Sequence, residues 1–259
     1  GTTFTQGDNA ALRNFSQFNY AAEPFVNQLK STGDPRAKFM IANYADPGAI
    51  ANNTNPDTVL ANQFGVPPGI TSDQILAVGS PYRGARGSGL NYSQINVNII
   101  AGLGVPEFWV TYAQTSLLLA EAAKRGWIPG GDATAKTHYE NGIAADMATY
   151  SLYPGASPIS ASAIAEYIAH PLVAYDPAEA LRLINTQYWI VNIRNGTEAF
   201  ANYRRSGFPV LAPNPFVTTP IRRLSYPDVE GSANNANYTA ASAAIGGDNI
   251  TSRVFWDTP

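Results

Sequence analysis

The apolar residues near the start of the chain repeat at the spacing of an amphipathic helix. Between residues 8 and 30 they lie three or four positions apart, which places them on one helix face: Ala11, Phe15, Phe18, Ala22, Phe25 and Leu29. Gly33 follows, and the Asp34-Pro35-Arg36 step disfavours any continuation of the helix. We therefore expect one helix over residues 8–30.

The periodic pattern is lost between residues 44 and 106. This segment is rich in Gly, Pro and Asn, which favour turns and loops over sustained helices or strands. We expect long ordered loops with a few short strands. A loop region of this length within a compact domain is unusual and often functional, so it is the first place to seek binding residues.

Helical spacing returns at Phe108 and continues to Lys124, where Gly126 is placed to end the helix. A second helix is expected from Asp132 to Tyr150, with Asp132 as its N-cap. The two helices, joined by a short Gly/Pro turn, are typical of a tetratricopeptide-like hairpin.

A second hairpin is expected from residues 178–193 and 197–205. Thr197 is the predicted N-cap of its last helix, Gly207 is suited to a left-handed C-terminal position, and Pro209 prevents continuation. The tail, residues 210–259, is predicted to be irregular. The fold class is therefore mainly α-helical, with tetratricopeptide-like hairpins that support a long irregular loop layer.

Composition narrows the function classes. The chain has 259 residues, 45% hydrophobic, and a net charge of −3 with only 14% charged residues. This balance provides a core but no basic surface, so nucleic acid is not an expected partner. No apolar run approaches the roughly 20 residues of a membrane-spanning helix. The absence of Cys excludes disulfides, thiolate metal sites and Cys nucleophiles.

The sequence offers no recognisable catalytic constellation. His138 and His170 lack a metal-ligand partner one helical turn away, and the Gly-rich segment 84–89 has the wrong spacing for a nucleotide-binding loop. A glycosidase needs two suitably placed carboxyl groups. Glu121 and Glu198 are instead expected to pair with Arg204 or Arg205 across a helix junction. We predict no enzyme activity, no cofactor and no metal site.

Three segments, in order, resemble signatures of the SusD/RagB family. The first runs from Tyr112 to Trp127, with Gln114 in place of the usual acid. The second is the hairpin 187–209, which contains Gln-Tyr-Trp-Ile, Glu-Ala-Phe and Arg-Arg-Ser-Gly-Phe-Pro, with Tyr188 replacing a Lys. The third is the tail, with Arg-Arg-Leu-Ser-Tyr-Pro at 222–227 and Gly-Gly-Asp-Asn at 246–249.

The resemblance implies that residues 1–259 form the C-terminal portion of a SusD-like domain. Family members are outer-membrane lipoproteins on the extracellular face, attached through a lipid anchor that would lie outside this chain. The implied function is capture of oligosaccharides or polysaccharides for import through a SusC-like TonB-dependent transporter. It also implies exposed apolar helix faces where N-terminal repeats would stack. Two alternatives stay open: a peptide-binding RagB-type protein and a glycan hydrolase domain.

In SusD-like proteins, ligand-contacting residues come partly from loops that precede the helical hairpin. An aromatic ring can stack on the C–H face of a sugar, while Arg side chains donate hydrogen bonds to hydroxyls. Five residues of the loop layer fit this chemistry: Phe64, Tyr82, Arg83, Arg86 and Tyr92. Packing within the loops is an equally good role for each of them.

Overall fold

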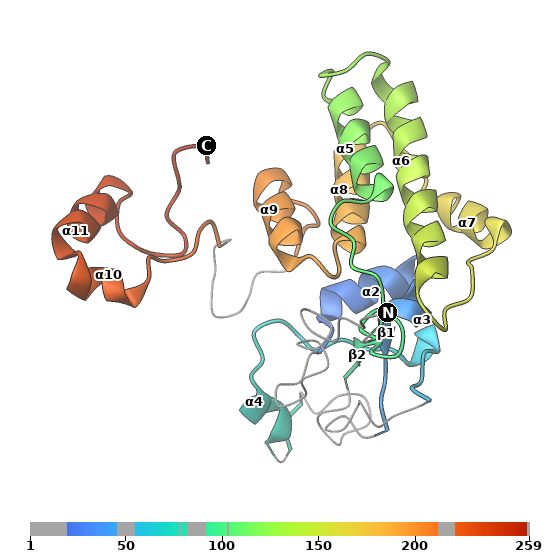
Figure 1. The fold of residues 1–259 in the computed structure, drawn as a ribbon, viewed down its shortest axis with the longest axis horizontal. Helices are drawn as coiled ribbons and strands as arrows, with labels where there is room; N and C mark the ends of the chain where they lie inside the picture. The colour runs from blue at the N-terminus through green and yellow to red at the C-terminus, as the bar shows by residue number, and fades with distance from the viewer. Residues whose placement is uncertain are drawn as a thin grey trace. The chain divides into compact units, whose positions relative to one another are not determined.

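The computed structural model describes residues 20–45, 55–77, 79–81, 92–102, 104–211 and 221–257. The chain divides into two compact units, residues 1–210 and residues 211–259, and each is described here by itself (Figure 1). Helices dominate both units, and the strands are only two residues long. The predicted fold class, mainly α-helical, is confirmed.

The first unit contains an antiparallel helical hairpin, α5 (Tyr112–Lys124) and α6 (Gly131–Thr149) (Figure 1). The helices approach closely at Gly142 of α6, where a Cβ atom would lie 2.7 Å from Cγ of Leu117. Leu117, Tyr139 and Ile143 are fully buried between the helices and their neighbours. The small residue at 142 therefore sets the spacing of the hairpin.

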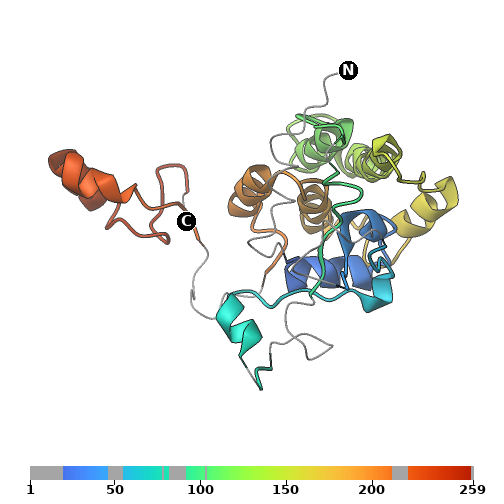
Figure 2. The same cartoon turned by 60° about the horizontal axis from the view of Figure 1, so that its bottom comes forward.

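A second hairpin packs beside the first. Helix α8 (Ala180–Val191) contacts α5, and α9 (Gly196–Ser206) contacts α8, as the neighbouring green and orange helices show in Figure 2. Helix α7 (Ala161–Ile168), which the sequence pattern did not predict, packs on α6. The 3₁₀ helix η3 (Tyr150–Leu152) extends α6 by one turn.

Two predicted helix caps are wrong. Helix α6 begins after Gly130, which has a φ of +106°, and Asp132 lies in its first turn. Helix α9 is capped by Asn195, whose side chain accepts a hydrogen bond from the backbone N–H of Glu198, rather than by Thr197. Both N-caps therefore lie two residues earlier than predicted. Gly207 does adopt the predicted left-handed conformation, with a φ of +75°.

The N-terminal helix is shorter than predicted. Helix α2 spans Glu23–Ser31, because Pro24 opens its first turn and residues 20–22 are extended and paired with the loop layer. Residues 8–19 of the predicted helix lie outside the described part. Helix α2 contributes Phe25, Val26 and Leu29 to a hydrophobic core. Helix α3 (Ala37–Met40) contributes residues to the same core.

The described loop layer contains little regular structure. Strand β1 (Ile41–Ala42) pairs with β2 (Gln94–Ile95) in an antiparallel ladder, with Ile41 opposite Ile95. The other described elements are η2 (Leu60–Asn62) and α4 (Ser72–Leu76). Backbone hydrogen bonds from Ala21 to Ser93 and from Ser93 to Phe64 hold neighbouring segments together.

The second unit differs from the prediction of an irregular tail. It contains two helices, α10 (Asp228–Ala233) and α11 (Asn235–Ala244), which pack on each other. Asp248 accepts hydrogen bonds from the guanidinium group of Arg223 and the backbone N–H of Tyr226. Helices α10 and α11 are short and are surrounded by Gly and Asn residues, which explains why the sequence pattern did not predict them.

Candidate functional site

A cavity of about 310 Å³ opens where the two hairpins meet. Three segments that are distant in sequence supply most of its lining: residues 107–114 at the start of α5, residues 146–153 at the end of α6, and residues 191–195 between α8 and α9. Ile100 of the loop layer completes it. Its volume lies at the lower end of the range for small-ligand sites, about 300–1,000 Å³. The hairpin packing therefore creates a space of the right size for a small ligand group.

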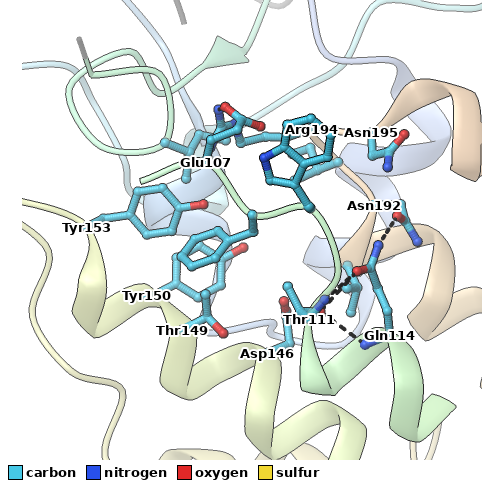
Figure 3. A pocket seen from close by; sticks show the side chains of 15 residues that line it. Glu107, Thr111, Gln114, Asp146, Thr149, Tyr150, Tyr153, Asn192, Arg194 and Asn195 are labelled. Carbon is cyan, nitrogen blue, oxygen red and sulfur yellow. Dashed lines mark hydrogen bonds and ion pairs between the residues drawn. The ribbon is translucent and has the colours of Figure 1, made fainter. Parts of the chain in front are cut away.

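One side of the cavity is aromatic. Tyr150 and Tyr153 are stacked with their ring centroids 5.8 Å apart, and both lie on the same side in Figure 3. Phe108 contacts Tyr153 edge-on at 5.8 Å. Trp109 also lines the cavity, and 88% of its surface is exposed. An exposed indole next to a cavity is available to stack on a ligand.

The opposite side is polar (Figure 3). Thr111 caps α5 through its hydroxyl, which accepts from the backbone N–H of Gln114, while the Gln114 side chain accepts in return from the Thr111 backbone. The amide of Gln114 also donates to Oδ1 of Asn192 at 2.8 Å. The amide of Asn192 donates to the backbone oxygen of Tyr188. These bonds fix two amide side chains from different hairpins before a ligand arrives.

An ion pair marks one end of the cavity. Arg194 donates to Oε2 of Glu107 at 2.7 Å and to the backbone oxygen of Pro106 at 3.1 Å. The pair joins the segment before α5 to the α8–α9 connection. Arg194 also hydrogen-bonds Tyr153, although burial outweighs this contact and raises the pKa of the Tyr153 hydroxyl. The two charges largely neutralise each other.

Asp146 lines the other end and belongs to a buried ionic cluster. Arg36, which is fully buried, donates to Oδ2 of Asp146 at 2.8 Å and makes its remaining ion pair with Asp34. Tyr167 and Gln187 accept further hydrogen bonds from Arg36. Burial raises the pKa of the Asp146 carboxyl, and the contact with Arg36 opposes this shift.

Phe64 and Tyr92, the described residues of the predicted sugar platform, are not among the residues that line this cavity. Tyr82, Arg83 and Arg86 lie outside the described residues. Tyr92 is 5% exposed and packs against Tyr20 and Phe64, each with a centroid distance of 5.5 Å. The described part of the platform is thus a packed aromatic cluster, and its role in ligand binding stays a prediction.

The hairpin cavity and the aromatic cluster around Tyr92 are nevertheless neighbours in the fold. A second cavity, of about 370 Å³, is lined by Tyr20 and Trp189, among others, and shares Asn192 and Ile193 with the first cavity. Tyr20 is the residue that contacts Tyr92. The α8–α9 connection therefore lies between the hairpin cavity and the aromatic cluster of the loop layer.

The acids of the family signatures have structural roles. As predicted, Glu121 pairs with Arg205 across the junction of α5 and α9, and it also accepts from Arg125 at 2.7 Å. Burial acts to raise the pKa of Glu121, but the hydrogen bonds from both Arg residues lower it overall. Glu198 accepts from the hydroxyl of Tyr188, the residue that replaces the family's usual Lys.

The chemistry of the cavity suits binding more than hydrolysis. Two carboxylates line it, but Glu107 is paired with Arg194 and Asp146 with Arg36. A glycosidase needs one carboxyl group as an acid and another as a nucleophile or base. Within the described residues, no group of three or more His, Asp or Glu side chains is placed to hold a metal ion.

Comparison with known proteins identifies the class. The SusD-like family model described as "Starch-binding associating with outer membrane" matches residues 3–227. The chain therefore belongs to the SusD-like family, which is associated with the outer membrane. No match was found among curated proteins. In the described part of the chain, no helix is both long and apolar enough to cross a membrane.

Solved structures agree with this assignment. A structure described as a chitin-binding protein is 29% identical, with a TM-score of 0.68 over 92% of this chain and 50% of its own. A Bacteroidetes SusD-like protein, AC2a, is 26% identical, with a TM-score of 0.74 and coverages of 97% and 56%. A SusD homologue of Bacteroides fragilis is 25% identical, with a TM-score of 0.67 and coverages of 91% and 51%. This chain spans about half the length of these structures.

Proposed function

We propose that the protein is a cell-surface binding protein that captures an oligosaccharide or polysaccharide without cleaving it. The observation that carries this proposal is the cavity at the hairpin junction, which combines an aromatic side with fixed amide groups. Aromatic rings stack on the C–H faces of sugars, and amides donate to and accept from hydroxyls. Membership of the SusD-like family supports the same function.

The amide side chains of the cavity are already ordered, which suits reversible binding of a ligand. Gln114 and Asn192 are held by hydrogen bonds to each other and to the backbone, so binding requires little ordering of their side chains. Trp109 stands exposed beside them. We also propose that Phe64, Tyr92 and the loop residues Tyr82, Arg83 and Arg86 contribute further contacts along a bound chain.

The wider assembly is also a proposal. A surface lipoprotein of this kind would be held at the outer membrane by a lipid anchor and would deliver glycan to a SusC-like TonB-dependent transporter. The support is the outer-membrane association of the family. Co-purification of the transporter with the full-length protein from outer membranes tests this partnership, and recovery of the protein alone under mild detergent would contradict it.

Isothermal titration with oligosaccharides of several classes tests the binding function. Chitin-derived oligomers are the first choice, because one similar structure is described as a chitin-binding protein. Saturable binding with no change in oligomer length after prolonged incubation is the expected result. Shortening of the oligomer would support the hydrolase alternative. Binding of peptides, with no binding of any glycan, would support the RagB-type alternative.

A further inference from the structure

The carboxylate of Asp146 is only half satisfied by its protein partners. The residue is 7% exposed, and Arg36 donates a hydrogen bond to its Oδ2 atom. In the described part of the chain the hydrogen bond to this carboxyl group goes to Oδ2, and 11% of the Asp146 side chain is exposed. Asp146 is also one of the residues that line the hairpin cavity.

The charge around Asp146 is also incompletely neutralised. Arg36 is engaged mainly by Asp34, which accepts hydrogen bonds from its Nε at 2.9 Å, its Nη2 at 2.6 Å and its backbone N–H at 2.9 Å. Asp146 receives one bond, from Nη1, while Nη2 also donates to Tyr167 and Gln187. The buried cluster therefore holds two carboxyl groups and one guanidinium group, which is one carboxyl group more than the guanidinium can neutralise.

The rest of the cavity does not supply the missing positive charge. Among the described residues that line the cavity, Arg194 is the cation, and Glu107 pairs with it at 2.7 Å. The remaining walls are aromatic rings and neutral amides, and aromatic faces attract cations. A buried carboxylate that lacks full compensation is best stabilised by a charged donor, because hydrogen bonds between charged groups are the strong ones.

We infer that the hairpin cavity recognises a primary ammonium group on the bound glycan, with Oδ1 of Asp146 as its acceptor. The ligand class is therefore an amino sugar with a free amine, such as a glucosamine unit of a β-linked oligomer. The ammonium donates to Asp146, and the aromatic side of the cavity packs on the sugar ring. This inference rests on the proposed glycan-binding function and names the substrate class for the same site.

The test compares three oligosaccharides of equal length and linkage, built from glucosamine, N-acetylglucosamine or glucose, by isothermal titration at pH 6. An amine with an ordinary pKa of about 7.7 is charged at this pH. The glucosamine oligomer is expected to bind at least tenfold more tightly than the glucose oligomer. The variant Asp146→Asn, which keeps an acceptor for Arg36, is expected to abolish this preference, whereas the charge-matched variant Glu140→Gln on the same helix leaves it unchanged.

A second readout needs no variant and so does not depend on the folding of Asp146→Asn. At pH 9 the ligand amine is neutral, and the preference for glucosamine over glucose is expected to fall below twofold. Burial raises the pKa of Asp146, so a rise in pH can only favour its charged form, and burial also raises the pKa values of the neighbouring Tyr150 and Tyr153 hydroxyls. A loss of preference at pH 9 therefore reports the loss of charge on the ligand amine.

The possible failures are distinguishable. Equal affinity for all three oligomers at pH 6, or tighter binding of the acetylated one, would overturn the ammonium site but leave glycan capture intact. A preference that persists in Asp146→Asn or at pH 9 would also overturn it. Failure to bind any oligosaccharide would overturn the proposed function and the inference together. Binding of a lysine-containing peptide in place of the oligomers would overturn both the glycan class and the amino-sugar assignment.

Discussion

At the residue scale, single side chains decide how closely the hairpin helices pack. Gly142 has no room for a Cβ atom, because Leu117 lies in the space where that atom would stand. By contrast, nothing lies within 4 Å of the corresponding position on Gly196, at the start of α9. The two glycines therefore provide a matched pair for testing the packing.

Gly142→Ala is expected to destabilise the protein. Overpacking of a core typically costs about 1–3 kcal/mol, which exceeds the gain of roughly 1 kcal/mol from replacing Gly by Ala in a helix. Gly196→Ala is expected to be neutral or slightly stabilising. Urea unfolding of both variants measures the difference, and equal stability of the two would contradict the close approach of α5 and α6.

The cavity residues show the limits of sequence reasoning at this scale. Glu107, Asp146 and Arg194 are dispersed over 88 positions, and no motif connects them. One departure from the family pattern coincides with the cavity. Gln114, which replaces an acid, lies on the cavity and contacts Asn192. Aromatic residues of the loop layer fit the chemistry of sugar binding, but Tyr92 is buried among other rings.

At the scale of elements, periodicity predicted the long helices and missed the short ones. The helices of both hairpins lie close to the expected ranges, because each buries an apolar face over several turns. Helices α7, α10 and α11 were missed. A helix of six to ten residues presents only two or three turns of pattern, so its stability depends on contacts that sequence does not reveal.

The cap of α9 can be tested by mutation. Asn195→Ala removes the side chain that accepts from the backbone N–H of Glu198, and loss of a cap typically costs about 1 kcal/mol. Thr197→Ala, at the position that the sequence favoured, is expected to cost less than half of that. Thermal unfolding of the two variants gives the comparison, and a larger loss for Thr197→Ala would restore the original assignment.

The junction of α5 and α9 is expected to lose stability in acid. The contacts with Arg205 and Arg125 lower the pKa of Glu121 in the folded state below its ordinary value near 4.5. The stabilisation that Glu121 provides is therefore complete above the pKa that this residue has in the unfolded chain. It is lost as the pH falls through the lower pKa of Glu121 in the folded protein. Burial raises the pKa of Asp146 in the folded state, so protonation of Asp146 stabilises the fold as the pH falls, which is the opposite effect.

A comparison with Glu121→Gln isolates the Glu121 contribution. The melting temperatures of the two proteins are expected to converge as the pH is lowered from 6 to 3, because protonated Glu121 resembles the Gln side chain. Asp146 is present in both proteins, so its effect cancels. A difference in melting temperature that stays constant with pH would show that the ion pair does not contribute as described.

At the scale of the whole molecule, the fold places binding groups on a rigid helical support. The cavity draws on both hairpins, so its shape depends on how α5, α6 and α8 pack together. The resemblance to SusD-like sequences predicted this architecture and the family, and both are confirmed. It did not predict the cavity, because the contact of two hairpins is a property of tertiary structure.

The most direct test of glycan capture at the hairpin cavity is the affinity of the variant Trp109→Ala, measured beside Trp127→Ala. Both side chains are largely exposed, at 88% and 69%, and they flank opposite ends of α5, so neither change should unfold the protein. Loss of one stacking ring is expected to weaken binding of the preferred oligosaccharide by about tenfold or more, equivalent to about 1.4 kcal/mol.

Trp127→Ala is expected to bind the same oligosaccharide as tightly as the unmodified protein. This pair of results would place the glycan at the cavity where the two hairpins meet. Unchanged binding by Trp109→Ala, or an equal loss in both variants, would contradict that location.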